Sequence, residues 1–298
     1  MGTKNKLFTV LACFLVLVLL AGAGAFKTKA KTSTVADKTE TSSVKIKKLG
    51  GVACRMPENS ALVFFGSTFG MKLTGYKAYK NFDEALFALK SGENDAIWAC
   101  DVSADYLLKK YEGLELVDAD LTSDIQKTEA ARFSFGMALK KDFGEKLREQ
   151  INDALASLKA DGTLEVLVSK YVDNAEYYET ESGKKERFYR DKMKTASGNG
   201  TIKVGISGAV PPLELLDEDV EPYGFCVALM NEIGQRLNKK IKFVYVDNET
   251  AFTSLMSGKI DMLFAYGTSP TTTEAKPGHI MTDGYLDMQR YRLIKLSK

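Results

Sequence analysis

The sequence carries almost no net charge. Its 298 residues include 41 lysines and arginines against 39 aspartates and glutamates, a formal surplus of +2. So small a surplus gives no reason to expect a nucleic acid as partner. The chain also has a single histidine, His279, and no residue spacing that matches a nucleophile with its base, a phosphate loop or a metal cluster. We therefore expect no catalytic residues, no metal and no cofactor, and place His279 in a surface loop.

Apolar runs long enough to span a membrane are absent after the first residues of the chain. Two lysines precede an apolar run at 7–20, and the small residues that follow include an A-x-A motif ending at Ala25. We predict that residues 1–25 are a signal peptide cleaved after Ala25. The alternative is an uncleaved anchor formed by residues 7–26. Residues 26–43, rich in Lys, Thr and Ser, are predicted to be a flexible spacer.

Cysteines are few. Three remain after the predicted cleavage site, Cys54, Cys100 and Cys226, and their odd number allows at most one disulfide. Their spacing fits no zinc site, so small buried apolar side chains are one interpretation. The other is a disulfide or soft-metal contact between Cys54 and Cys100, because both end apolar strands on one side of a lobe.

What the sequence does contain is a repeated phrase. LKSGENDAIWA at 89–99 and LMSGKIDMLFA at 255–265 each read as a helix end at Ser-Gly, a turn with an aspartate, and an apolar strand. Asp95 and Asp261 are placed where a short acceptor can bond backbone N–H groups. One such phrase is common by chance, but two with matching spacing predict two related α/β lobes.

The rest of the chain from residue 44 alternates helix and strand patterns, as expected for parallel sheets flanked by helices. With 45% apolar and 27% charged residues, the composition is that of a globular protein. The charged and then Gly/Ser-rich stretch 179–200 is predicted to be a linker. It divides the chain into residues 44–178 and 201–298.

These segments resemble the family 3 (polar amino acid) receptors of ABC importers, which are type II solute-binding proteins. GTIKVGISGAVPPLELL and the second repeat resemble that family's opening lobe. FDEALFALKSG with the first repeat resembles its second lobe, and the stretch around DGTLEVLVSKYV its closing segment. The resemblance implies a two-lobed α/β fold with a ligand cleft between the lobes. Residues 44–178 would form the second lobe plus the closing segment, and residues 201–298 the first lobe.

The order of the segments is reversed relative to the family, because the closing segment precedes the opening one. Two explanations are open. The chain is either a circular permutant bridged by residues 179–200, or the remnant of a tandem receptor that has lost its outer quarters.

The resemblance, together with the rule that ligands bind outside the carboxyl ends of parallel strands, implies a set of ligand-binding residues. Asp101 would hold a ligand ammonium, and Thr268 and Gly267 would offer a hydroxyl and close backbone approach. The full set is Asp101, Thr268, Gly267, Ser269, Ser207, Ala209, Arg55, Ser60 and Leu213. Structural roles are the alternative for two of them. Asp101 could cap the following helix, and Thr268 could shape a turn.

The sequence departs from the family pattern at the implied site. The arginine that forks onto a ligand carboxylate is missing, with Ala275 near its place, and Leu213 replaces an aromatic platform. Cys226 replaces an aspartate of the family. The pocket would then use Arg55 or Arg132, take a different solute, or have lost binding.

The sequence as a whole predicts a solute-binding protein, secreted or at the surface or in the periplasm of a bacterium. It would capture a small polar solute, an amino acid or a related compound, for an ABC permease. A sensor or protein-interaction module on the same fold is the alternative from another class. A periplasmic dehydratase is disfavoured because no acid-base pair can be placed. The protein's only membrane contact would be an uncleaved N-terminal anchor. A homodimer in which two copies exchange lobes is a further expectation.

Overall fold

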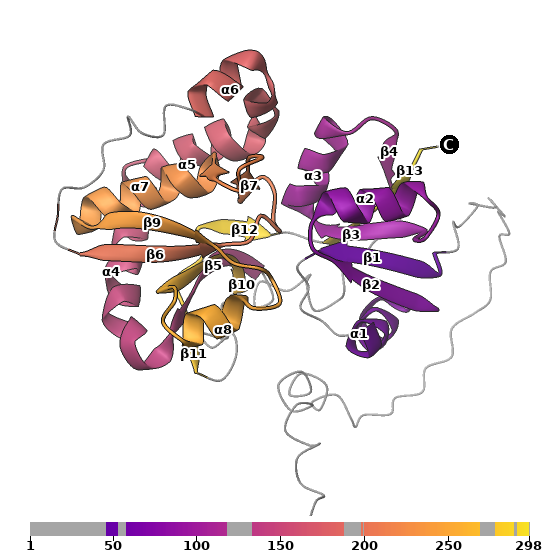
Figure 1. Cartoon of the computed structure of the whole chain (residues 1–298), viewed down its shortest axis with the longest axis horizontal. Helices are drawn as coiled ribbons and strands as arrows, with labels where there is room; N and C mark the ends of the chain where they lie inside the picture. The colour runs from indigo at the N-terminus through magenta and orange to yellow at the C-terminus, as the bar shows by residue number, and fades with distance from the viewer. Residues whose placement is uncertain are drawn as a thin grey trace, which may run out of the picture. The chain divides into compact units, whose positions relative to one another are not determined.

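The computed structural model describes residues 46–52, 58–117, 133–187, 198, 200–268, 278–288 and 291–297. Residues 44–298 form one compact unit. The predicted signal peptide and spacer lie outside the described residues. The compact unit contains two sheets with helices against them (Figure 1).

The first sheet has five strands in the order β2-β1-β3-β13-β4. The strands are β1 (Lys48–Val52), β2 (Gly75–Tyr79), β3 (Ala96–Cys100), β4 (Leu114–Leu116) and β13 (Tyr291–Leu296). The helices around it are α1 (Glu58–Phe69), α2 (Phe82–Lys90) and α3 (Asp101–Lys110). Helix α1 lies on one face, and α2 and α3 lie on the other (Figure 1). We call this body the β1 lobe.

The second sheet has the order β11-β5-β10-β6-β9, and β12 also pairs with β5. The strands are β5 (Phe133–Lys140), β6 (Thr201–Ile206), β9 (Lys240–Tyr245), β10 (Met262–Thr268), β11 (His279–Met281) and β12 (Leu286–Met288). Its helices are α4 (Lys141–Ala160), α5 (Thr163–Val168), α7 (Phe225–Leu237) and α8 (Ala251–Met256). A short hairpin, β7 (Leu215–Leu216) and β8 (Pro222–Tyr223), follows β6. We call this body the β6 lobe.

Both sheets follow one plan. Three parallel strands, β2-β1-β3 or β9-β6-β10, are followed by an antiparallel strand from elsewhere in the chain, β13 or β5. The prediction of two related lobes, each a mainly parallel sheet flanked by helices, is confirmed. The lobes do not coincide with halves of the sequence, because β5 and α4 join the β6 lobe and β13 joins the β1 lobe.

The repeated phrase has the same geometry in both lobes. Gly92 and Gly258 lie in the left-handed region, with φ of +76° and +77°, as a helix-ending glycine does. Asp95 Oδ2 accepts the N–H groups of Lys47 and Lys48 at 2.7 and 2.8 Å. Asp261 Oδ2 accepts the N–H of Lys203 at 2.7 Å. Each aspartate therefore fastens the turn to the start of the neighbouring central strand, β1 or β6.

Two local predictions were wrong. Residues 181–187, placed in the linker, form helix α6 (Glu181–Arg187), which is tied to the preceding segment by an ion pair of Lys170 with Glu186 at 2.6 Å. His279, placed in a surface loop, is 4% exposed in β11 and packs edge-on against Phe252, with ring centroids 4.6 Å apart. Pairing of β11 with β5 draws the histidine into the sheet. Trp98, inside the apolar strand of the first repeat, is 8% exposed and belongs to the core.

Candidate functional site

Asp101 begins α3 directly after β3 ends. Its Oδ1 accepts the N–H of Val102 at 2.9 Å, and the carboxylate lies in the first turn of the helix, where negative charge is favourable. The predicted capping role is not observed, because the N-cap residue of α3 is Cys100, no side chain caps the helix, and Asp101 is its first residue. The residue is half-buried and directly follows the carboxyl end of β3. A ligand role for Asp101 stays a prediction.

The loop after β6 is built around a buried carboxylate. Glu214 is only 2% exposed, and its Oε2 accepts the hydroxyl of Ser207 at 2.9 Å. The Glu214 N–H donates to the carbonyl of Val210 at 3.0 Å. The Ser207 hydroxyl proton is thus committed to Glu214, which leaves that oxygen as an acceptor. Sequence reasoning missed Glu214, although an acid inside the apolar stretch PPLELL is a signal for a buried, bonded carboxylate.

The two apolar candidates in this loop are buried. Leu213 has no exposed surface and Ala209 is 2% exposed. Both belong to the main apolar cluster, which also contains Phe225 and Ile206. In this conformation they hold the loop in place, and any contact with a solute stays a prediction.

The loop is also fastened from the β1 lobe. Ser103 of α3 is 1% exposed and donates its hydroxyl to the carbonyl of Pro211 at 2.5 Å. Cys100 Sγ donates to Ser103 Oγ at 3.2 Å, and burial raises the pKa of this thiol to about 11. Cys100 is a free thiol in this structure. Cys54 lies outside the described residues.

The end of β10 is the third part of the site. Gly267 pairs with Phe135 of β5, and a side chain placed at Gly267 would meet nothing within 4 Å. The space over Gly267 is therefore open, as close approach of a ligand to the backbone requires. Thr268 pairs with Ser134 through its backbone. The side chain of Thr268 and the whole of Ser269 lie outside the described residues.

The remaining predicted contacts cannot be placed. Arg55, Arg132 and Ala275 lie outside the described residues, and Ser60 is located only by its backbone in α1. Within the part of the chain that the structure describes, no group of three or more His, Cys, Asp or Glu side chains could hold a metal. Over the same ranges, no helix combines the length and apolar character that a membrane crossing needs.

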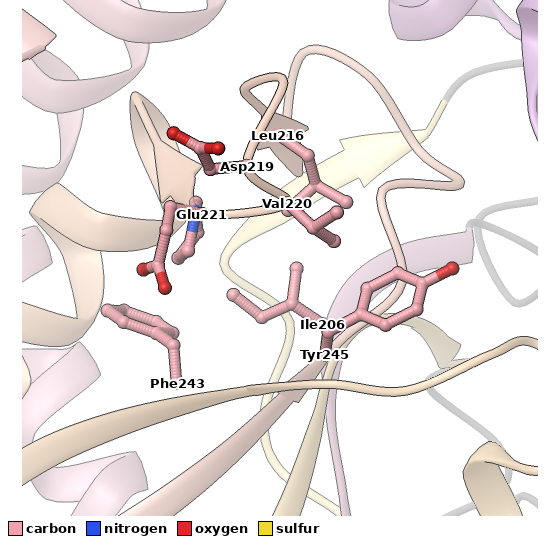
Figure 2. A pocket seen from close by; sticks show the side chains of 8 residues that line it. Ile206, Leu216, Asp219, Val220, Glu221, Phe243 and Tyr245 are labelled. Carbon is pink, nitrogen blue, oxygen red and sulfur yellow. The ribbon is translucent and has the colours of Figure 1, made fainter.

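A separate pocket of about 220 Å³ lies beneath the β7–β8 hairpin. It is lined by Ile206, Leu216, Asp219, Val220, Glu221, Pro222, Phe243 and Tyr245. Figure 2 shows Val220 and Ile206 facing one another across it. None of these residues was predicted as a site residue, although Ile206 directly precedes Ser207. Val220, at the hairpin tip, has a φ of +64°, which a β-branched residue rarely adopts.

Comparisons with known proteins agree with this architecture. The strand order and the two lobes define a type II periplasmic-binding-protein fold. Residues 202–277 match the model of the family described as bacterial extracellular solute-binding proteins, family 3. The predicted resemblance of the β6 lobe to this family is confirmed. No curated protein matches the chain.

Solved structures with a similar arrangement include an ancestral amino acid-binding protein described as a precursor of cyclohexadienyl dehydratase. It is 11% identical, with a TM-score of 0.40, over 85% of this chain and 82% of that one. The periplasmic VFT2 domain of Bordetella pertussis BvgS is 12% identical, with a TM-score of 0.37, over 86% and 82%. The binding protein AgaA of A. tumefaciens R10, solved with agropinic acid, is 14% identical, with a TM-score of 0.36, over 67% of this chain.

This chain spans only 40% of the length of AgaA. All three TM-scores lie below 0.5, so the fold assignment rests on the strand order and not on these structures.

Proposed function

We propose that the protein is an extracytoplasmic solute-binding protein that captures a small polar solute, an amino acid or a related compound, for an ABC importer. The observation that carries the proposal is the family match of residues 202–277 within a two-lobed sheet arrangement. Binding by lobe closure needs no chemistry, so the protein acts without catalytic residues or a cofactor. Asp101, Ser207, Gly267 and Thr268 would supply the polar contacts.

The order of the segments is that of a circular permutant. Support comes from both sheets, in which every strand is delivered by this one chain. A tandem remnant would have no reason to complete both sheets. Lys48 begins β1 and Leu296 ends β13, and these two strands lie on either side of β3. Two strand spacings, about 10 Å, separate β1 from β13, so a short bridge would restore the family's order.

The location and partners follow from the same family assignment. The signal peptide at residues 1–25 would export the chain, and an ABC permease would receive the solute. Because each lobe takes a strand from the far part of the chain, exchange of lobes between two copies is open to this protein. The sensor or interaction module stays the second candidate, favoured by the burial of Leu213 where an aromatic platform is expected.

The test is thermal unfolding of the purified protein against amino acids and small organic acids. A solute at 100 times its Kd should stabilise the fold by roughly 2.7 kcal/mol. Asp101→Ala should abolish the shift. Asp105→Ala, an exposed acid on the same helix, should not. A cooperative fold that responds to no solute would favour the interaction module. Light scattering on the same sample gives the oligomeric state, which must be a dimer if two copies exchange lobes.

A further inference from the structure

Arg292 occupies a position in β13 that sequence reasoning passed over. It lies opposite Ala99 of β3, and its neighbour Tyr291 lies opposite Cys100, the residue before Asp101. Because side chains alternate along a strand, Arg292 shares the sheet face of Ile294, which α3 covers. The Arg292 side chain therefore lies on the α3 face of the sheet, paired with a position two residues before Asp101.

The Arg292 side chain has one buried donor without an acceptor. Its Nε is buried and has no hydrogen-bond partner. No ion pair of Arg292 occurs within the described ranges. The two other arginines whose side chains are described are both paired, Arg148 with Glu145 at 3.0 Å and Arg236 with Asp161 at 2.6 Å. A buried donor of a charged group without an acceptor costs free energy. Arg292 bears that cost at the carboxyl end of β3, where the candidate site lies.

We infer that Arg292 binds a carboxylate group of the solute, in place of the family arginine missing near Ala275. A guanidinium offers a planar fork of donors that matches a carboxylate. Asp101, which follows β3 directly, would accept an ammonium, so the two residues together select a solute that carries both charges, an α-amino acid. This inference rests on the proposed function and names its ligand class. It also explains why a half-buried arginine is kept without a partner.

Stability and binding should move in opposite directions when Arg292 is changed. Arg292→Met keeps the length of the side chain and removes the unpaired donor, so the protein without solute should unfold at the same temperature or higher. The same variant should weaken the Kd for amino acids about 10- to 100-fold, the loss of a charged hydrogen bond. Arg148→Met, which removes a paired surface arginine on α4, should leave the Kd unchanged.

A purely structural arginine would give the opposite result. If an acid of the segment 118–132 pairs with Arg292, Arg292→Met will lower the unfolding temperature without solute and leave the Kd unchanged. That outcome overturns the inference. Arg292→Lys, which keeps the charge but not the fork, separates the two cases further, because a Kd intermediate between wild type and Arg292→Met is expected only for carboxylate recognition.

The panel also separates this inference from the proposed function. Each amino acid is paired with its carboxamide, which lacks the carboxylate. If the amino acid and its carboxamide raise the unfolding temperature of wild type equally, the protein binds solutes but Arg292 does not recognise a carboxylate. If wild type answers to neither, the proposed function fails. Sodium acetate then tests Arg292 alone, against sodium chloride at equal ionic strength. Greater stabilisation of wild type than of Arg292→Met supports a carboxylate site, and equal responses overturn it.

Discussion

Asp95 and Asp261 occupy equivalent places in the two lobes and make equivalent bonds. Asp95 accepts two backbone N–H groups at the start of β1 and Asp261 accepts one in β6, and each aspartate's own N–H donates to that strand at 2.9 Å. A carboxylate serves here because it accepts several bonds at once. These two side chains fix where a helix ends and where its strand enters the sheet.

Removing either carboxylate should cost similar stability. Asp95→Ala and Asp261→Ala are each expected to lower the free energy of unfolding by about 2 kcal/mol, the value of hydrogen bonds to a charged group. Urea unfolding followed by circular dichroism measures both. Asp105→Ala, exposed on α3, is the matched control and should change the value little. A loss confined to one lobe's variant would contradict the equivalence.

Val220 carries strain that a smaller residue would relieve. Its φ of +64° is unfavourable for a β-branched side chain, and 43% of the residue is exposed, so little burial is lost on truncation. Val220→Gly should raise the free energy of unfolding by about 1 kcal/mol. Val166→Gly, an exposed valine inside α5, should lower it by a similar amount. Destabilisation by both variants would show that Val220 packs productively.

The thiol of Cys100 makes stability depend on pH in alkaline solution. Its pKa is raised by burial from 9.0 to about 11, so the unfolded chain ionises first. The stabilisation is complete below pH 9 and is lost as the pH rises to about 11. Cys100→Ser removes the titrating group. The decline in unfolding free energy between those pH values should therefore be smaller in Cys100→Ser than in wild type.

Helix α3 joins elements of the two lobes through one polar face. Ser103, Tyr106 and Lys110 recur at helical spacing and contact groups outside the β1 lobe. Tyr106 and Lys110 approach Glu179 of η3 (Ala175–Glu179), whose Oε1 also accepts the hydroxyl of Tyr223 in β8 at 3.3 Å. Three donors from two elements, α3 and β8, thus converge on one carboxylate.

Ser103→Ala tests this contact. It removes the only hydroxyl that the structure's described residues place on the Pro211 carbonyl, and leaves a buried acceptor unpaired. The expected loss is about 1–3 kcal/mol of unfolding free energy. Ser67→Ala, an exposed serine on α1, is the control. If both variants behave alike, the contact of α3 with the loop after β6 contributes nothing in solution.

Pattern reasoning predicted elements better than it predicted side-chain surroundings. Helix α4 carries Ile151, Leu155 and Leu158 at helical spacing, and all three are buried, so its buried face can be read from the sequence. Gly92 and Gly258 ended their helices as expected. Other features depend on segments from distant parts of the chain. Examples are the burial of His279 and Glu214 and the lack of an acceptor for Arg292 Nε. No local spacing encodes such partners.

Each sheet contains a strand that is separated in sequence from its others: β13 follows the whole β6 lobe, and β5 directly follows the first four strands of the β1 lobe. In each lobe, one strand of the sheet therefore comes from a segment next to the other lobe in the sequence. If the chain is a permutant, a gene that joins residue 297 to residue 46 through a short Gly/Ser bridge and opens at 188–197 should fold to the same structure. Ends opened inside α4, at residue 150, should not. Circular dichroism and thermal unfolding distinguish them.

The position of β13 bears on how the protein is made. β13 lies between β3 and β4, so the β1 lobe, although its other strands leave the ribosome early, cannot close its sheet until nearly all of the described chain has been synthesised. An unfinished sheet exposes strand edges, which are prone to pair wrongly. If the chain is exported as proposed, this delay would keep it unfolded, and able to pass through a translocation channel, until its synthesis is nearly complete.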